Sequence, residues 1–308
     1  MTSVAGGRRT FPLVPRRQLN GLPLGDVPGR RRGHGSNIIG HRLYQPGDAV
    51  SKIDWQASAC LATASGRDVF VVREQAADEA PRVVIVVDRR PEMSLYPEPL
   101  PWLRKHAALR EAADAIASSA AAARADTAAL DFGDGEAWWI PPGRRDRRGL
   151  IAERSAEARF AAPPDALERA FEFLAARRHE LPPGSFVFVL SDFLDPLQTE
   201  TWLRAVRHGW DVVPVVIQDP IWEQSFPAVA GIGVPIAEPR SGAVTLVRMS
   251  RRQAARRREA NEQRLARLLV DFGALGVQPV VLGTSEPDDV DAAFLAWAEQ
   301  SRGRGWGR

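Results

Sequence analysis

Short apolar runs recur along the chain, and each is bounded by polar or turn residues. Runs of this kind are typical of strands buried on both faces of a parallel sheet. They predict buried strands at 82–87, 186–190 and 211–217, with a last strand at 277–282. Three shorter strands are expected at 127–132, 137–140 and 243–247, the first two being joined by the turn at 133–135.

Segments with helical spacing alternate with these strands. Helices are expected at 102–124, 165–178 and 289–300, and another is expected to begin at Asp195-Pro196 and to end near His208. Ser250 and Gln253 form a capping-box pattern before a long helix with an apolar stripe at Leu265, Leu268, Leu269 and Phe272. This alternation predicts an α/β fold: a mostly parallel sheet with helices on both faces and right-handed crossovers.

The residues before the first buried strand follow a different pattern. Residues 1–35 are rich in Gly, Pro and Arg without strand or helix periodicity, which predicts a flexible basic arm. A turn at 46–48 and a strand at 68–74 predict a β-rich extension over 36–80. The main α/β domain is therefore expected at 81–300, with a flexible tail at 301–308.

Composition and charge indicate in which compartment the protein works and which kinds of partner it can bind. The chain has 308 residues, a formal net charge of +3 and a single cysteine, Cys60, so no internal disulfide can form. No apolar segment has the length of a signal peptide core or a membrane span, so a cytoplasmic location is expected. Arginines cluster without a recognisable nucleic-acid docking element, which favours solvated surface over nucleic-acid binding; they are Arg16, Arg17, Arg30, Arg31, Arg32, Arg251, Arg252, Arg256, Arg257 and Arg258.

Common catalytic motifs are absent from the sequence. Neither lysine, Lys52 or Lys105, precedes a serine or threonine, so there is no phosphate-binding P-loop. No glycine-rich dinucleotide fingerprint, nucleophile elbow or paired-histidine metal motif occurs. Asp88 and Asp192 each follow a predicted buried strand, so both carboxylates are expected at the same edge of the sheet. They either cap the following turns or form a cation site.

The segment after residue 40 carries the most specific pattern. Its distinctive residues are Arg42, Tyr44, Pro46, Gly47, Asp48, Ile53, Asp54, Trp55, Ser58, Ala59, Val72, Arg73 and Glu74. Together they resemble the pattern of bacterial domain-of-unknown-function family fifty-eight (DUF58), which belongs with von Willebrand factor A domains. The resemblance implies a von Willebrand factor A-like sheet domain with an N-terminal β-rich extension.

The resemblance also implies a metal-ion-dependent adhesion site, whose usual first motif is D-x-S-x-S. Here Asp88 matches, but Arg90 and Glu92 stand at the serine positions. Asp192 matches the late aspartate, and no threonine lies between Thr127 and Thr199. A guanidinium repels a divalent cation, so we expect no metal or only weak Mg²⁺ at Asp88 and Asp192. Arg90 either bridges these two carboxylates in place of the cation or points to solvent beside an eroded site.

The group formed by Tyr44, Pro46, Asp48, Asp54 and Trp55 in the extension has two interpretations. In the structural one, the turn at 46–48 shapes the chain, Asp54 caps or pairs with Arg42 or Arg73, and Trp55 packs on the sheet. In the other, this group contacts a partner directly.

The resemblance implies a non-enzymatic adaptor that works with a MoxR-type AAA+ ATPase in protein maturation or stress response. The arginine-rich arm could in addition touch acidic lipid or an acidic partner. Two alternatives stay open: a metal-dependent hydrolase using Asp88, Glu92, Asp192 and Asp195, or nucleic-acid binding through the arginine clusters.

Overall fold

The computed structural model describes most of the chain. The described residues are 9–13, 15, 23–67, 69–94, 103–143, 147–156, 159–229, 231, 233–238, 241 and 243–304, without the side chains of 23–40, 74–79, 237 and 302–304. Among these residues, no helix is both long and apolar enough to cross a membrane.

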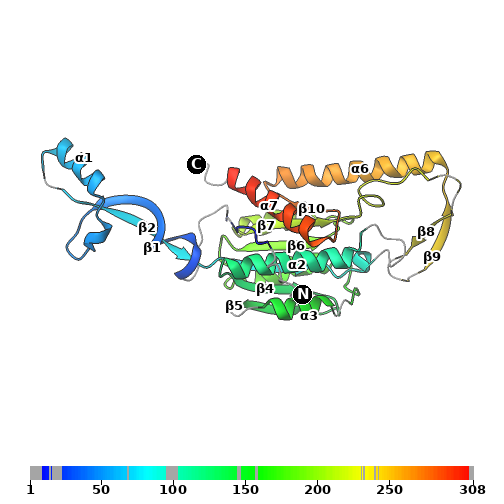
Figure 1. Ribbon diagram of the computed structural model, residues 1–308. Helices are drawn as coiled ribbons and strands as arrows, with labels where there is room; N and C mark the ends of the chain where they lie inside the picture. The colour runs from blue at the N-terminus through cyan, green and yellow to red at the C-terminus, as the bar shows by residue number, and fades with distance from the viewer. Residues whose placement is uncertain are drawn as a thin grey trace, which may run out of the picture.

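A six-stranded sheet forms the centre of the molecule (Figure 1). Its strand order is β10-β7-β6-β3-β4-β5, and every neighbouring pair is parallel except β4 and β5. The strands are β3 (Arg82–Val87), β4 (Asp126–Asp131), β5 (Trp138–Gly143), β6 (Phe186–Ser191), β7 (Asp211–Ile217) and β10 (Val280–Leu282). The prediction of a mostly parallel α/β sheet is confirmed, because each buried apolar run forms one of these strands.

Helices cover both faces of this sheet. One face packs on α2 (Lys105–Ala122), α3 (Arg148–Ala156) and α7 (Pro287–Arg304), and the other on α4 (Ala166–Ala176), α5 (Thr199–Arg207) and α6 (Arg251–Ala274). Successive side chains of β3 alternate between these layers, so Ile85 joins the first core and Val86 the second. Because helices cover both faces of the sheet, the side chains on both sides of each strand must be apolar, and the strand sequences are therefore continuous apolar runs.

The long helix α6 begins as expected. Ser250 accepts a hydrogen bond from the backbone of Gln253, and the Gln253 side chain bonds back to Ser250, which completes the capping box. Before it lies a hairpin of β8 (Gly233–Ala237) and β9 (Val244–Arg248), as the strand expected at 243–247 suggested.

Two helix boundaries correct the sequence prediction. The helix expected to begin at Asp195-Pro196 begins at Thr199, with Gln198 as its N-cap. Between β6 and this helix the chain bends at 194–195, directly after buried Phe193, whose φ is positive at 49°. The last helix extends to Arg304, so residues 301–304 of the predicted flexible tail are helical, and 305–308 lie outside the described residues.

The N-terminal segment differs from the flexible arm expected over residues 1–35. Phe11 and Leu13 are buried in the core on the α2 and α7 face. The Phe11 ring stacks on Phe294 with centroids 4.8 Å apart, and its backbone N–H donates to the Ser119 hydroxyl. The prediction failed for these described residues because two apolar side chains among prolines and arginines give no periodic signal, although both are buried in the core. Residues 1–8, 14 and 16–22 lie outside the described residues.

A two-stranded extension projects from one end of the sheet (Figure 1). It consists of β1 (Pro23–Leu43) and β2 (Val71–Glu79), with η1 (Val50–Lys52) and α1 (Trp55–Ser65) between them. The strand β1 begins inside the range predicted as arm, so the boundary at residue 35 is wrong. The helix α1 was not predicted either, because it has no amphipathic stripe.

Candidate functional site

Four neighbouring strands of the sheet each end in an aspartate. In sheet order these are Asp219 after β7, Asp192 after β6, Asp88 after β3 and Asp131 at the end of β4. The chain turns in opposite directions from β3 and β6, so Asp88 and Asp192 flank the topological switch point, where α/β sheets usually bind ligands. Their expected position at one edge is confirmed, and the backbone N–H of Asp88 donates to Leu190 of β6.

Asp88 is paired with a cation supplied two residues later. The Arg90 guanidinium donates to both carboxylate oxygens of Asp88 at 2.8–3.1 Å, and the Arg90 backbone N–H donates at 2.9 Å. The Ser191 hydroxyl adds a bond of 2.6 Å from the end of β6. Burial by itself would lower the pKa of Arg90, but the bonds to Asp88 outweigh it and raise that pKa. Arg90 is therefore a permanent cation held inside the protein.

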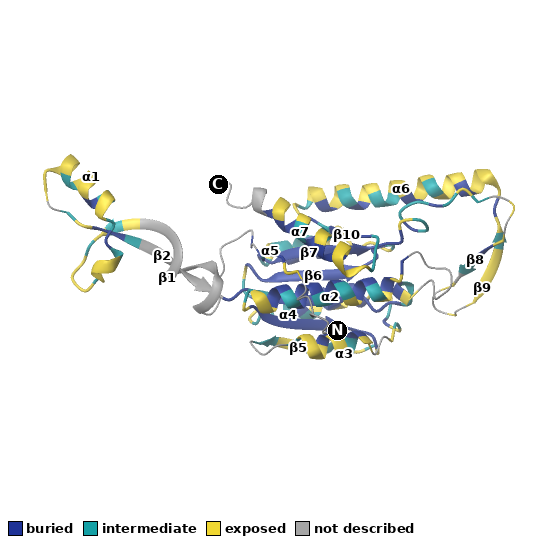
Figure 2. Cartoon of the chain, in the orientation of Figure 1, coloured by how far each residue is buried: buried dark blue, intermediate teal, exposed yellow. Residues whose placement is uncertain are grey.

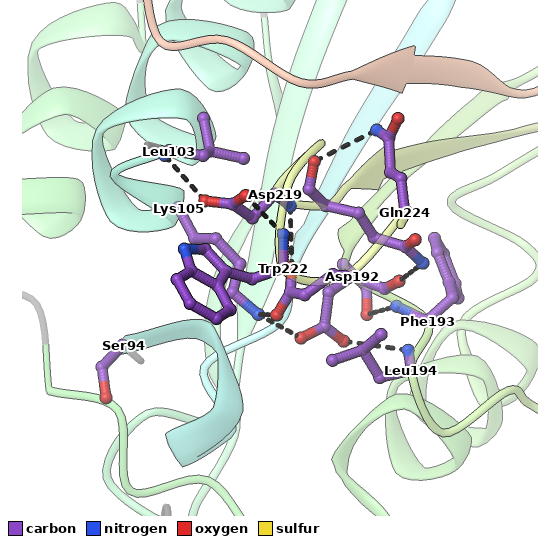
Figure 3. A network of polar contacts seen from close by, with 12 residues as sticks. Ser94, Leu103, Lys105, Asp192, Phe193, Leu194, Asp219, Trp222 and Gln224 are labelled. Atoms are coloured by element: carbon purple, nitrogen blue, oxygen red, sulfur yellow. Dashed lines mark hydrogen bonds and ion pairs between the residues drawn. The ribbon is translucent and has the colours of Figure 1, made fainter. Parts of the chain in front are cut away.

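Asp192 has a different counter-ion, Lys105, from the first turn of α2 (Figure 3). The Lys105 ammonium is completely buried and donates to Asp192 at 2.7 Å and to Glu223 at 2.5 Å. Burial favours neutral lysine, yet the two carboxylates dominate and raise the Lys105 pKa to about 12. Burial likewise raises the pKa of Glu223, against the attraction of Lys105. The ammonium thus occupies the space between two carboxylates that a cation site would need.

The two outer aspartates are also satisfied by the chain itself. Arg154 of α3 donates to both oxygens of Asp131 at 2.6 and 2.9 Å, and the Arg89 guanidinium lies 3.5 Å away. Asp219 accepts the backbone N–H groups of Leu103, Ile221 and Trp222. We call Asp88, Asp131, Asp192, Asp219, Arg90, Lys105, Arg154 and Glu223 the carboxyl-edge cluster.

The hypothesis that Arg90 bridges Asp88 and Asp192 is only half right. Arg90 does bind Asp88, and its side chain is buried, which rules out the alternative of a solvent-directed arginine. Asp192, however, is hydrogen-bonded to Lys105 and feels Arg90 only as a longer-range attraction. Two cations, one for each carboxylate, thus replace the single bridge that the sequence suggested.

The remaining predicted site residues contribute less to the cluster. Glu92, in η2 (Pro91–Ser94), has a buried carboxylate oxygen that forms no hydrogen bond to the part of the chain that the structure describes, and it attracts Arg90. The Asp195 side chain is 86% exposed and lies 3.9 Å from the Arg90 guanidinium.

A divalent cation does not fit this arrangement. Nitrogen atoms of Arg90 and Lys105 already lie at hydrogen-bond distance from Asp88 and Asp192, and a third positive charge there would be repelled. Among the described residues, no group of three or more His, Cys, Asp or Glu side chains is arranged to hold a metal ion.

We therefore expect no Mg²⁺ or Mn²⁺ binding at this site. Isothermal titration calorimetry of the full chain with either ion should give only the heat of dilution. The control is the same titration of Asp88→Asn, which should be indistinguishable. Saturable binding in the wild type that disappears in Asp88→Asn would contradict the assignment of Arg90 and Lys105 as counter-ions.

The family-type residues of the extension form a second group of polar contacts. Arg42 makes two bonds of 2.6 Å to Asp48, and this contact, with the Gln45 N–H, lowers the Asp48 pKa to about 2. Pro46 and Gly47 form the turn between them, where Gly47 has a φ of +107°. These residues therefore hold the turn together.

The sequence suggested that Asp54 caps a helix or pairs with Arg42 or Arg73. The hydrogen bonds of its carboxylate go to other residues, and Arg73 only helps to lower the Asp54 pKa by a longer-range attraction. The Asp54 carboxylate caps α1 by accepting the Ala57 N–H and contacts His41 at 3.1 Å. In β2, Arg73 pairs with His41 and Glu74 with Gly40 along the backbone ladder. Capping was one of the expected roles of Asp54 and is confirmed.

The aromatic residues of the extension are less buried than expected. Trp55 is 61% exposed and touches the edge of the Phe70 ring, which in turn contacts Tyr44. The expectation that Trp55 packs on the sheet is thus wrong for most of its surface.

The sequence reasoning missed several members of the carboxyl-edge cluster. Asp131 lies inside a predicted strand, and Asp219 follows another by two residues, so both could have been found by the reasoning used for Asp88. Lys105 is one of two lysines and lies in the first turn of the helix predicted at 102–124, which is a weak signal. Glu223 lies in an irregular segment, and no sequence pattern marks it as a site residue.

The fold and this cluster define a class: an α/β protein whose switch point is closed by internal ion pairs. Residues 40–267 match the family described as "Protein of unknown function DUF58", and the chain belongs to this family. Similar curated proteins include "Uncharacterized protein Mb1516" of Mycobacterium bovis and "Uncharacterized protein Rv1480" of Mycobacterium tuberculosis. Each is 29% identical over 219 residues, which cover 70% of this chain and 66% of the relative, slightly less than two thirds of its length.

Two solved structures are also similar to the chain. One is the "conserved hypothetical protein BatB" from Bacteroides thetaiotaomicron, with 13% identity and a TM-score of 0.41. The other is "an aerotolerance-related membrane protein" from Bacteroides fragilis, with 12% identity and a TM-score of 0.39. Each match covers 73% of this chain and all of the other.

Proposed function

We propose that this protein is a non-enzymatic binding module with a von Willebrand factor A-like domain, and that it acts as an adaptor for a MoxR-type AAA+ ATPase. The ATPase part of this proposal comes from the resemblance of the extension and strand-end residues to the family. The binding-module part comes from the carboxyl-edge cluster.

The observation that carries the proposal is the internal neutralisation of Asp88 and Asp192. A hydrolase would need carboxylates free to hold a metal, activate water or donate a proton. Here both are buried and bound to cations of the same chain at 2.7–3.1 Å. The edge is therefore suited to a fixed structural role, and binding must use the exposed surfaces around it.

The adaptor role predicts direct binding to the ATPase. The test mixes the purified full chain with the MoxR-type ATPase of the same organism and measures co-elution with ATP, with ADP and without nucleotide. We expect co-elution that depends on the nucleotide, because an adaptor must distinguish the states of its motor. An ATPase variant that cannot bind nucleotide serves as the control. Separate elution in all three states would argue against the adaptor role.

A further inference from the structure

The β8–β9 hairpin lies at the end of the molecule opposite the extension, and β9 and the start of α6 are exposed there (Figure 2). Leu246 is 72% exposed, more than any other large hydrophobic side chain among the described residues, and Val244 is 64% exposed. Both share one face of β9 with Arg248, because side chains alternate along a strand. The opposite face carries Val247, which packs on the small core around Phe226. Leu246 and Val244 are not part of this core.

An exposed apolar face is unusual for a hairpin of this kind. Antiparallel strands with one face on a core normally carry polar residues on the other face, where water solvates them. Here the outer face carries Val244 and Leu246 instead, and Pro235 of β8 lies opposite Leu246 in the ladder. Apolar residues that are exposed together indicate a surface that another molecule covers.

Arginines adjoin these apolar side chains. The chain from Val244 to Arg258 contains six arginines and no acidic residue. Arg252 and Arg256 lie one turn apart at the start of α6, on the side of the helix away from buried Ala254. We call the following exposed residues the hairpin patch: Val244, Leu246, Arg248, Arg251, Arg252 and Arg256.

The hairpin patch keeps its positive charge in the folded chain. None of its four arginines forms an ion pair within the part of the chain that the structure describes. Two acidic residues border the patch, and both are hydrogen-bonded elsewhere: Glu238 accepts the Ser241 N–H, and Glu259 accepts the Gln263 amide. Four arginines against these two carboxylates leave a positive surface, which is complementary to an acidic partner.

The mixture of aliphatic and arginine side chains favours an acidic lipid surface as this partner. The apolar part of the patch is two side chains, much less than the about 800 Å² that each partner buries in a standard protein interface. A bilayer needs less contact, because aliphatic side chains enter its headgroup boundary and each basic residue near an anionic surface strengthens binding about fivefold. Nucleic acid gives Leu246 no apolar surroundings, and residues 239–258 contain no aromatic side chain on which bases could stack.

We propose that the hairpin patch is a peripheral membrane-binding surface for acidic phospholipids. Leu246 and Val244 enter the boundary between headgroups and acyl chains, and the four arginines bind the headgroup phosphates. This surface is separate from the carboxyl-edge cluster, and the inference does not depend on an ATPase.

The test measures co-sedimentation of the full chain with vesicles of phosphatidylcholine, either alone or mixed with phosphatidylglycerol. We expect binding only to the mixed vesicles, and this binding should weaken as salt rises. Replacing both Arg251 and Arg252 with glutamine should weaken it at least about tenfold, and Leu246→Thr about fivefold. The matched controls are Arg267→Gln and Val270→Thr, at exposed positions further along α6, and both should bind as the wild type does. Circular dichroism should show that all variants are folded.

A fluorescent label reports whether the apolar side chains enter the bilayer. Cys60 is the only cysteine, so Leu246→Cys in a Cys60→Ser background provides a single site for an environment-sensitive maleimide dye. The emission of this dye should shift to the blue with anionic vesicles. The same dye on Val270→Cys should show no shift.

Chain that stays in solution with anionic vesicles would overturn the proposal. So would vesicle binding that the paired arginine variant or Leu246→Thr leaves intact, because the contact would then lie elsewhere or use charge alone. Fluorescence anisotropy with a labelled DNA duplex and with labelled polyglutamate tests the other acidic partners. Binding to either one without binding to vesicles would assign the arginines to nucleic acid or to an acidic protein instead.

Discussion

Replacing Lys105 with methionine should lower the free energy of unfolding by about 3–5 kcal/mol, because it leaves buried carboxylates without their counter-ion. The Lys105 ammonium is completely buried and is the cation that both Asp192 and Glu223 contact. Methionine keeps the volume of the side chain but removes the charge. Urea denaturation followed by far-ultraviolet circular dichroism measures the loss.

Two comparisons separate the charge effect from packing. Lys52→Met removes a lysine of the extension that is only partly buried, and should change stability by less than about 0.5 kcal/mol. Combining Lys105→Met with Asp192→Asn and Glu223→Gln should recover part of the loss, since no buried charge is then left unpaired. A loss below about 1 kcal/mol in Lys105→Met would show that the ion pairs are not structural.

The same lysine gives the wild type a characteristic alkaline dependence. Its pKa is raised in the folded state to about 12 from 10.5, so its contribution is complete below pH 10.5 and is lost as pH rises towards 12. The Lys105→Met variant should lack this component of the pH–stability curve.

Phe11→Ala should lower the free energy of unfolding by about 3–5 kcal/mol, as expected for truncation of a buried phenylalanine. Phe11 is 3% exposed and contacts the rings of Phe188, Phe294 and Trp297. Removing it opens a cavity between the sheet and α7. The loss is measured by urea denaturation, with unfolding followed by tryptophan fluorescence.

The control for this prediction is Phe70→Ala in the extension, where the ring is 46% exposed. Phe70→Ala should lower the free energy of unfolding by less than half as much as Phe11→Ala, because nearly half of the Phe70 side chain is already in water. Equal effects of the two substitutions would mean that the N-terminal segment does not contribute to the core as described.

Local sequence patterns predicted the sheet well because its strands are buried on both faces. The run at 82–87, for example, coincides with β3 residue for residue. Asp88 and Asp192 could be placed at one edge for the same reason, since parallel strands share a carboxyl end. The cations that bind these carboxylates could not be predicted in the same way, because the contacts are distant in sequence. The Lys105–Glu223 contact, for example, joins residues 118 positions apart.

Irregular segments caused the other errors. Phe11 docks through one side chain rather than a repeating face, so periodicity carries no information about it. α1 consists of small and uncharged residues that leave no amphipathic stripe, although Asp54 before it is a usable N-cap signal. Trp55 was expected to be covered by its own chain, and the structure leaves most of it in solvent.

The counter-ions of Asp88 and Asp192 are covalently part of the polypeptide, which gives them an effective concentration that no dissolved ion can match. We expect a site neutralised in this way to respond neither to chelators nor to changes in magnesium concentration. The strand ends then carry the same charge in every ionic environment in which the chain is folded. Regulation that acts at this edge of the sheet would therefore have to break a buried ion pair rather than supply or remove a metal.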